Sequence, residues 1–306
     1  MRKSRRLEMG DSVGVVAPAS PFKRERFDQG VAEIERLGFR PVVSEATFAR
    51  DGYLAGDPVL RATALTESWS DDSVMGLIAA RGGYGSAQIL PLLDKSLFCD
   101  SCKQFVGHSD LTAFLAYLTT HCGVVCFHGP MVMNLAGGES SYDRDSLLRV
   151  VMNAEPLGEL TGDRLETLYP GEAVGPILGG TLTQLAASLG TPHAFSPPPG
   201  YVLLLDDLNE QPYRIDRMLT QLSASGLLGL ASAVVCGEFP GCDGPVDHTT
   251  VREVLGRIFK AFPGPVLFGF PTGHTTGPTL TVPLGVEARV VGGRRACVAI
   301  TEAAVL

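Results

Sequence analysis

The sequence predicts an α/β protein: an N-terminal domain of three layers around a parallel sheet, followed by a smaller, mixed α/β C-terminal domain. Two observations lead to this prediction. Apolar runs that end in polar or glycine-rich loops alternate with segments of helical periodicity, which is the pattern of parallel βαβ units. Near the C-terminus short strand-like runs follow one another, which favours a mixed second sheet. A chain of 306 residues is long enough for two such domains.

The first βαβ unit lies at the start of the chain. Residues 12–20 form an apolar run that enters a polar loop, and Phe27, Val31 and Ile34 then share one face of a helix. A second strand begins at Pro41. The unit lacks a Gly-x-Gly-x-x-Gly loop, so a dinucleotide site is not supported.

A glycine-rich loop follows the next predicted strand. A polar helix over 61–69 leads to a strand over 76–80, which runs into Arg81-Gly82-Gly83-Tyr84-Gly85-Ser86. Glycines allow backbone N–H groups to approach a ligand closely, as an anion or oxyanion site requires. A tight strand-to-helix turn explains the glycines equally well.

A serine occupies the turn between the following strand and helix. The run Gln104-Phe105-Val106-Gly107 precedes Ser109, and helical spacing then places four apolar residues on one face: Leu111, Phe114, Leu115 and Leu118. A hydroxyl on such a turn has the position of a nucleophile elbow, beside free N–H groups of the helix start. The Gly-x-Ser-x-Gly form is half matched, because Leu111 replaces the second glycine. An ordinary helix N-cap is the alternative.

A polar segment divides the whole chain into two parts. We expect an N-terminal domain over 1–136, a linker over 137–172 and a C-terminal domain over 173–306. In the last part, the strand Tyr201–Leu205 delivers Asp206 at its end, and a strand near 266–269 leads to His274. A hairpin is predicted across Gly292-Gly293.

Composition limits the function classes. The net charge of −8 argues against a nucleic-acid partner, since such affinity rests on clustered Lys and Arg. We expect no membrane span and no secretory leader, and seven cysteines without a regular framework are typical of reduced thiols, so a cytoplasmic location is predicted. A zinc site is a less favoured alternative, because a second Cys-x-x-Cys pair is missing; the candidate ligands from which it could be formed are Cys99, Cys102, His121, Cys122, Cys126 and His128.

A serine nucleophile needs a base within hydrogen-bond reach and a third group that orients the base. Ser109, Asp206 and His274 all follow predicted strands. Since ligands of open parallel sheets bind at the carboxyl ends of strands, these three side chains are candidates for one site.

Five motifs, in order along the chain, resemble those of the LD-carboxypeptidases, which include the muramoyltetrapeptide carboxypeptidases and the microcin C immunity peptidases. The resemblance extends from about Val13 to Leu284. The motifs are Arg81-Gly82-Gly83-Tyr84-Gly85, Gly107-His108-Ser109-Asp110-Leu111-Thr112, Gly179-Gly180-Thr181-Leu182, Leu205-Asp206-Asp207-Leu208-Asn209-Glu210-Gln211-Pro212-Tyr213-Arg214-Ile215-Asp216-Arg217 and Gly273-His274.

The resemblance implies a two-domain serine peptidase that hydrolyses an L,D-peptide bond and releases D-alanine from recycled murein tetrapeptide. It implies Ser109 as nucleophile, His274 as general base and Asp206 as the acid, with the N–H groups of Gly83 and Asp110 as the oxyanion hole. It further implies a homodimer, a muropeptide substrate, and no metal or cofactor. The candidates for substrate binding are Arg81, Gly82, His108, Gly180 and Glu210.

Three departures from the family pattern concern the site. Asp206 replaces the usual Glu and is one methylene shorter, with Glu210 as a possible substitute. His108 replaces a Tyr or Phe, and Thr181 replaces an Asn. Alternatives therefore stay open: a peptidase for peptidyl-nucleotide antibiotics, a catalytically lapsed muropeptide-binding protein, or a structural domain. Nucleotide-specific members stack the base on aromatic side chains, whereas Trp69, the single Trp, precedes the motif loops.

Overall fold

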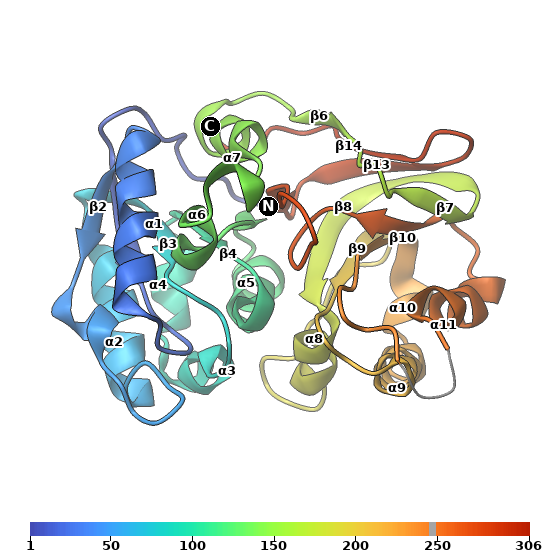
Figure 1. Cartoon of the computed structure of the whole chain (residues 1–306), viewed down its shortest axis with the longest axis horizontal. Helices are drawn as coiled ribbons and strands as arrows, with labels where there is room; N and C mark the ends of the chain where they lie inside the picture. The colour runs from blue at the N-terminus through green and yellow to red at the C-terminus, as the bar shows by residue number, and fades with distance from the viewer. Residues whose placement is uncertain (245–248) are drawn as a thin grey trace.

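The computed structural model describes residues 1–244 and 249–306, which form two sheets side by side, each with helices packed on it (Figure 1). The first sheet has the order β12-β5-β4-β3-β1-β2. Its strands are β1 (Ser12–Val16), β2 (Arg40–Val43), β3 (Val74–Ala79), β4 (Gln104–Gly107), β5 (Cys126–His128) and β12 (Val282–Leu284). β1 to β5 are parallel, which confirms the predicted βαβ architecture.

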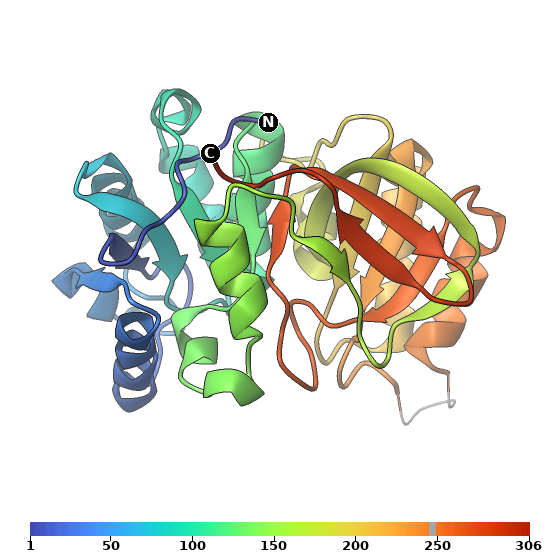
Figure 2. The same cartoon turned by 90° about the horizontal axis from the view of Figure 1, so that it is seen from above.

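Helices of the first half lie on both faces of this sheet (Figure 2). They are α1 (Arg24–Arg36), α2 (Pro58–Ser70), α3 (Ser86–Ile89), α4 (Lys95–Asp100), α5 (Thr112–Ala116), α6 (Val132–Leu135) and α7 (Arg144–Met152). α1 follows the predicted periodicity and buries Phe27 and Ile34. It packs closely on α6, because a Cβ at Gly30 would lie 2.1 Å from the carbonyl oxygen of Val132.

The second sheet is mixed, as predicted, and has the order β6-β14-β13-β8-β9-β10-β11-β7. Its strands are β6 (Gly158–Leu160), β7 (Glu166–Tyr169), β8 (Gly171–Thr181), β9 (Tyr201–Asp206), β10 (Ala231–Gly237), β11 (Val266–Phe270), β13 (Glu287–Gly292) and β14 (Cys297–Ile300). β8 to β11 are parallel, and β13 and β14 form the predicted hairpin. The helices are α8 (Leu182–Ser188), α9 (Pro212–Ala224), α10 (Leu227–Leu230) and α11 (Val251–Ile258).

The order of the strands along the chain does not follow the division into two sheets. β12, from the last part of the chain, pairs antiparallel with β5 at the edge of the first sheet. β6 and β7, from the segment 137–172, occupy opposite edges of the second sheet. The predicted domain boundaries at residues 136 and 173 therefore stay a prediction. The two sheets, and not these boundaries, define the two halves of the structure.

One apolar core joins the two sheets. Buried side chains of the first sheet, such as Leu77 and Phe127, belong to the same cluster as Val202 and Leu204 of β9. Because both sheets contribute to this cluster, side chains from both halves can be held at fixed distances from each other. Each helix within residues 1–244 and 249–306 is too short or too polar to cross a bilayer.

Candidate active site

Ser109 lies on a strained turn between β4 and the helical segment that continues into α5. A short 3₁₀ turn, η3 (Ser109–Leu111), begins directly after His108. Ser109 has φ +63°, a conformation that costs a non-glycine residue about 1 to 3 kcal/mol and that concentrates at functional sites. The strain distinguishes this serine from an ordinary N-cap, whose backbone is extended.

The loop after β3 lies against this turn. A Cβ at Gly82 would be 2.9 Å from Cβ of Ser109 and 3.3 Å from the amide nitrogen of Asp110, so only glycine fits there. Gly83 has φ +102°, which favours glycine. The loop therefore brings its backbone beside the serine and beside the first free N–H groups of the helical segment.

Two buried side chains fix these loops. Arg61 donates through Nη1 to the carbonyls of Pro18 (2.7 Å) and Gly85 (2.8 Å). The carboxylate of Asp110 accepts from the backbone N–H of Ser86 (2.8 Å) and from Nε2 of Gln184 on α8 (3.1 Å). The Asp110 side chain thus joins the serine turn to the glycine loop and to the second half.

The second half brings an acid and a histidine to the serine. Asp206 ends β9, and His274 lies four residues after β11. His274 Nε2 is 3.1 Å from Ser109 Oγ, and Nδ1 is 2.6 Å from Asp206 Oδ2. The backbone N–H of His274 also donates to Asp206 Oδ2 at 3.0 Å. The three side chains predicted to form one site are therefore in a continuous hydrogen-bonded chain.

The shorter acid reaches the histidine because the backbone comes close. A Cβ at Gly273 would lie 2.4 Å from Asp206 Oδ2, and one at Gly237 would lie 3.1 Å from Asp206 Cβ. Two glycines thus let neighbouring segments approach Asp206. Glu210, the possible substitute for the acid, instead pairs with Arg214, with 3.5 Å between Oε2 and Nη1.

The local charges suit a general base. Burial alone would raise the pKa of Asp206, but the charges of His274 and His128 and the hydrogen bond from His274 hold that pKa well below its ordinary value. Burial alone would lower the pKa of His274, but the Asp206 carboxylate raises it above its ordinary value. With Nδ1–H donated to Asp206, Nε2 of neutral His274 can accept the serine proton.

His108 is a buried neighbour of this chain. Its ring packs edge-to-face against His274, with centroids 5.3 Å apart, and Nδ1 is 2.9 Å from the carbonyl oxygen of Gly129. Burial and the charges of His274 and His128 lower the pKa of His108 to about 3. Around neutral pH the ring is therefore uncharged and does not compete with His274 for a proton.

The other substrate-binding candidates occupy different places. Arg81 is exposed, and its Nη1 donates to the carbonyl of Pro21 at 2.7 Å. Gly180 touches α5, since a Cβ there would be 2.6 Å from Thr112 Oγ1. Glu210 pairs with Arg214 on α9. Gly82 therefore lies against the serine, whereas Gly180 joins the two halves.

Two contacts of Asp206 were not predicted from the sequence. Thr181 donates through Oγ1 to Asp206 Oδ1 at 3.0 Å, and His128 Nε2 lies 3.6 Å from the same oxygen. Both residues lie at carboxyl ends of strands, which was the available signal. His128 is also one of the candidate zinc ligands; among the described residues, no three or more Cys, His, Asp or Glu are grouped to hold a metal ion.

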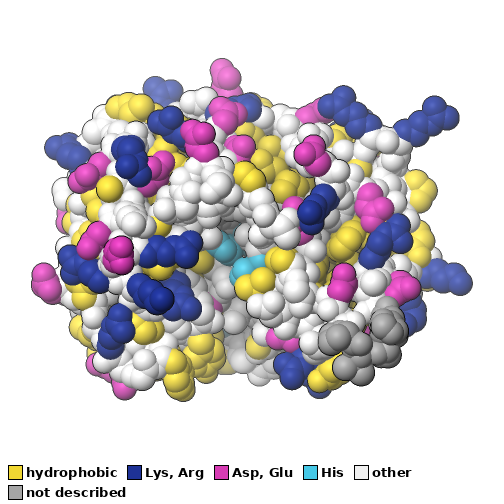
Figure 3. Space-filling model, in the orientation of Figure 1, with side chains coloured by type: hydrophobic (Ala, Val, Ile, Leu, Met, Phe, Trp, Pro, Cys, Tyr) yellow, Lys and Arg dark blue, Asp and Glu magenta, His cyan; other side chains and the backbone are white. Residues whose placement is uncertain are grey.

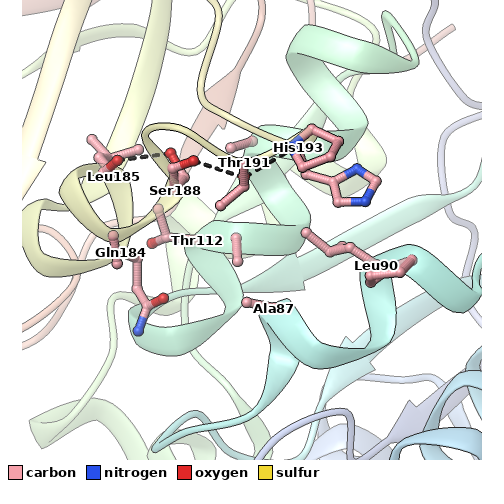
Figure 4. Close-up of a pocket in the computed structure, with 13 residues that line it drawn as sticks. Ala87, Leu90, Thr112, Gln184, Leu185, Ser188, Thr191 and His193 are labelled. Carbon is pink, nitrogen blue, oxygen red and sulfur yellow. Dashed lines mark hydrogen bonds between the residues drawn. The ribbon is translucent and has the colours of Figure 1, made fainter. Parts of the chain in front are cut away.

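A hollow between the two halves opens onto His108 and His274. Histidine side chains lie at its bottom (Figure 3), and a cavity of about 300 Å³ there is lined by His108, Asn134, Ser140, Ser141, Leu208, Pro240, Gly273, His274, Thr275, Thr276 and Gly277. A second cavity of about 260 Å³ lies between α3, α5 and α8, with Thr112, Gln184 and His193 among its lining residues (Figure 4). The first cavity is the one that contacts His274.

Comparisons with known proteins place the chain in one family. A model of the LD-carboxypeptidase N-terminal domain matches residues 13–129, and one of the C-terminal domain matches residues 174–290. The chain is 34% identical to the probable murein peptide carboxypeptidase of Bacillus subtilis over 94% of this chain and 90% of that protein.

Solved structures show the same fold. Muramoyltetrapeptide carboxypeptidase from Oxalobacter formigenes superposes with a TM-score of 0.83 at 26% identity, covering 95% of this chain and 99% of that one. The microcin C7 self-immunity protein MccF superposes with a TM-score of 0.92 at 23% identity, covering all of both chains.

Proposed function

The chain belongs to the LD-carboxypeptidase family, and from this premise we propose that it releases D-alanine from murein tetrapeptide during cell-wall recycling. It is a serine-type peptidase, and the bond it cleaves is an L,D-peptide bond. The observation that carries the proposal is the chain of hydrogen bonds from Ser109 through His274 to Asp206.

In the proposed mechanism, Ser109 Oγ attacks the scissile carbonyl carbon while His274 Nε2 takes the hydroxyl proton. The carbonyl oxygen becomes an oxyanion, which the N–H groups of Gly83 and Asp110 stabilise. His274 then returns the proton to the leaving amine of D-alanine, and the C–N bond breaks. Water, deprotonated by His274, hydrolyses the acyl-serine, and Asp206 holds the imidazole tautomer throughout.

Substrate binding is proposed for the hollow above His274. Arg81, next to Gly82 at the serine, supplies a cation for a substrate carboxylate, and His108 supplies an uncharged wall. Gly82 allows the loop to lie directly against the Ser109 turn. Gly180 and Glu210 contribute indirectly, through the packing of α5 and the start of α9.

Cleavage of a peptidyl nucleotide is less well supported. Trp69 is fully buried among Phe98 and Phe114, and its Nε1 donates to Ser101 Oγ at 2.8 Å, so it cannot stack on a base in the hollow. A lapsed enzyme is disfavoured by the 2.6 Å contact between Asp206 and His274.

The direct test measures D-alanine release from murein tetrapeptide by the purified protein, with Ser109→Ala as control. Release by the wild type alone is expected. Release by both proteins would contradict the serine mechanism. Cleavage of an aminoacyl sulfamoyl adenylate in preference to tetrapeptide would instead identify the protein as a peptidase for peptidyl-nucleotide antibiotics.

We also propose a cytoplasmic homodimer. The seven cysteines are free in the structure, which supports a reducing compartment, and the family resemblance implies the dimer. Light scattering of the eluted protein would measure its mass, and a monomer at micromolar concentration would contradict the dimer. Fractionation of cells that express the tagged protein would test the location.

A further inference from the structure

The imidazole of His128 is buried beside Asp206, the candidate acid, and its Nε2 makes no hydrogen bond within the described residues. His128 is the last residue of β5 and is 0% exposed. Its Nε2 has no hydrogen-bond partner within reach in the described part of the chain, and the carboxylate oxygen that it faces is Asp206 Oδ1, at 3.6 Å. A buried polar atom without a partner is costly, so its position calls for an explanation.

The two oxygens of Asp206 have separate surroundings. Oδ2 accepts from the side chain and the backbone of His274, whereas Oδ1 accepts from Thr181 and faces His128. Rotation of the carboxylate would weaken both sets of contacts together. Donors at Oδ1 therefore also determine the direction of Oδ2.

We propose that His128 is a positioning residue of this reaction: its Nε2–H holds Oδ1 of Asp206 and so keeps Oδ2 aligned with His274. The inference rests on the proposed function, because it takes Asp206 as the acid. A carboxylate only accepts hydrogen bonds, so the proton lies on Nε2. Hydrogen bonds of catalytic groups are often long in unliganded enzymes and shorten when substrate is bound.

The hydroxyl of Thr272 lies against the other side of the ring. Its Oγ1 is 3.3 Å from His128 Nδ1 and donates to the carbonyl oxygen of Leu280 at 2.9 Å. Since Thr272 precedes Gly273 and His274 in the same loop, the His128 ring contacts both the acid and the loop that carries the base. His128 itself does not line the cavity at His274.

The first test compares His128→Leu with His128→Gln. Leucine removes the donor, whereas glutamine places an amide N–H near the position of Nε2. We expect His128→Leu to lower kcat about 100-fold, the effect of a misplaced catalytic group, with KM unchanged. His128→Gln should recover most of kcat. Equal losses in both variants, or a loss confined to KM, would overturn the proposal.

A matched threonine pair decides the matter if His128→Leu does not fold. Thr272 and Thr281 are both fully buried, but the Thr281 hydroxyl has no partner in the described residues. Thr272→Val should lower kcat several-fold, and Thr281→Val should leave it unchanged. Equal kcat values for the two valine variants would contradict the role of the His128 ring.

The Ser109→Ala variant distinguishes a failure of the positioning role of His128 from a failure of the proposed function. If it is inactive and His128→Leu keeps the wild-type kcat, the positioning role fails and the proposed function stands. If Ser109→Ala retains wild-type turnover, the proposed function itself fails.

Discussion

The serine turn of the first half and the strand end at Asp206 in the second half both contact His274, but different physical features determine the two regions. Around Ser109 the determinants are backbone features: a positive φ, the close approach of Gly82 and free amide N–H groups. Around Asp206 they are charge and burial, with imidazoles and a threonine hydroxyl directed at one carboxylate. The first region should therefore be sensitive to steric change. The second, although Gly237 and Gly273 also keep it sterically tight, should in addition be sensitive to changes of charge.

The largest expected effect comes from removing the groups that join the two regions. Ser109→Ala and His274→Ala should each lower kcat for D-alanine release by about 10⁶-fold, as for other triads. The double variant should be no worse than either single variant, because the groups act as a unit. Fully additive losses would mean that the two regions act separately.

Replacement of the acid tests the second region alone. Asp206→Asn should lower kcat by about 10⁴-fold, because His274 loses the partner that fixes its tautomer. Asp207→Asn is the matched control: Asp207 accepts from Thr183 at the start of α8, and burial raises its pKa to about 6. That variant should keep kcat. Similar losses of kcat in the two variants would show that catalysis depends on the total negative charge of this region and not on the Asp206 carboxylate in particular.

A steric change tests the first region. Gly82→Ala would place a Cβ 2.9 Å from Ser109 Cβ, which displaces the turn or the oxyanion hole. A loss of about 10² to 10³ in kcat is expected, comparable with removal of one oxyanion donor. Gly229→Ala, at an exposed helical position with open space around its Cβ, should have no effect on kcat. An active Gly82→Ala protein would show that this loop is not part of the site.

The smallest effect is the dependence on pH. Asp206 raises the pKa of His274 above its ordinary value of 6.5, and only neutral His274 can take the serine proton. As pH falls below that raised pKa, kcat/KM should decrease about tenfold per pH unit. In Asp206→Asn the residual activity should extend to lower pH, since the pKa of His274 falls. If the acidic limb of the pH profile is the same in Asp206→Asn and in the wild type, Asp206 does not determine the pKa of His274.

The sequence by itself determined the order of the elements and the places of the three candidate catalytic residues at strand ends. These features depend on local periodicity and turn chemistry, which short segments express independently of the rest of the chain. The glycine loop, the turn at Ser109, the strand before Asp206 and the final hairpin were all predictable for that reason. The presence of five motifs in the expected order also predicted the family, and the two domain matches confirm that prediction.

Only the tertiary structure decided how the parts fit together. The pairing of β12 with β5 and the contacts of His128 and Thr181 with Asp206 join residues far apart in the chain. The question of whether aspartate can replace glutamate also had no local answer. It depends on how closely Gly237 and Gly273 let two other segments approach Asp206, and such distances follow from the packing of the whole interior.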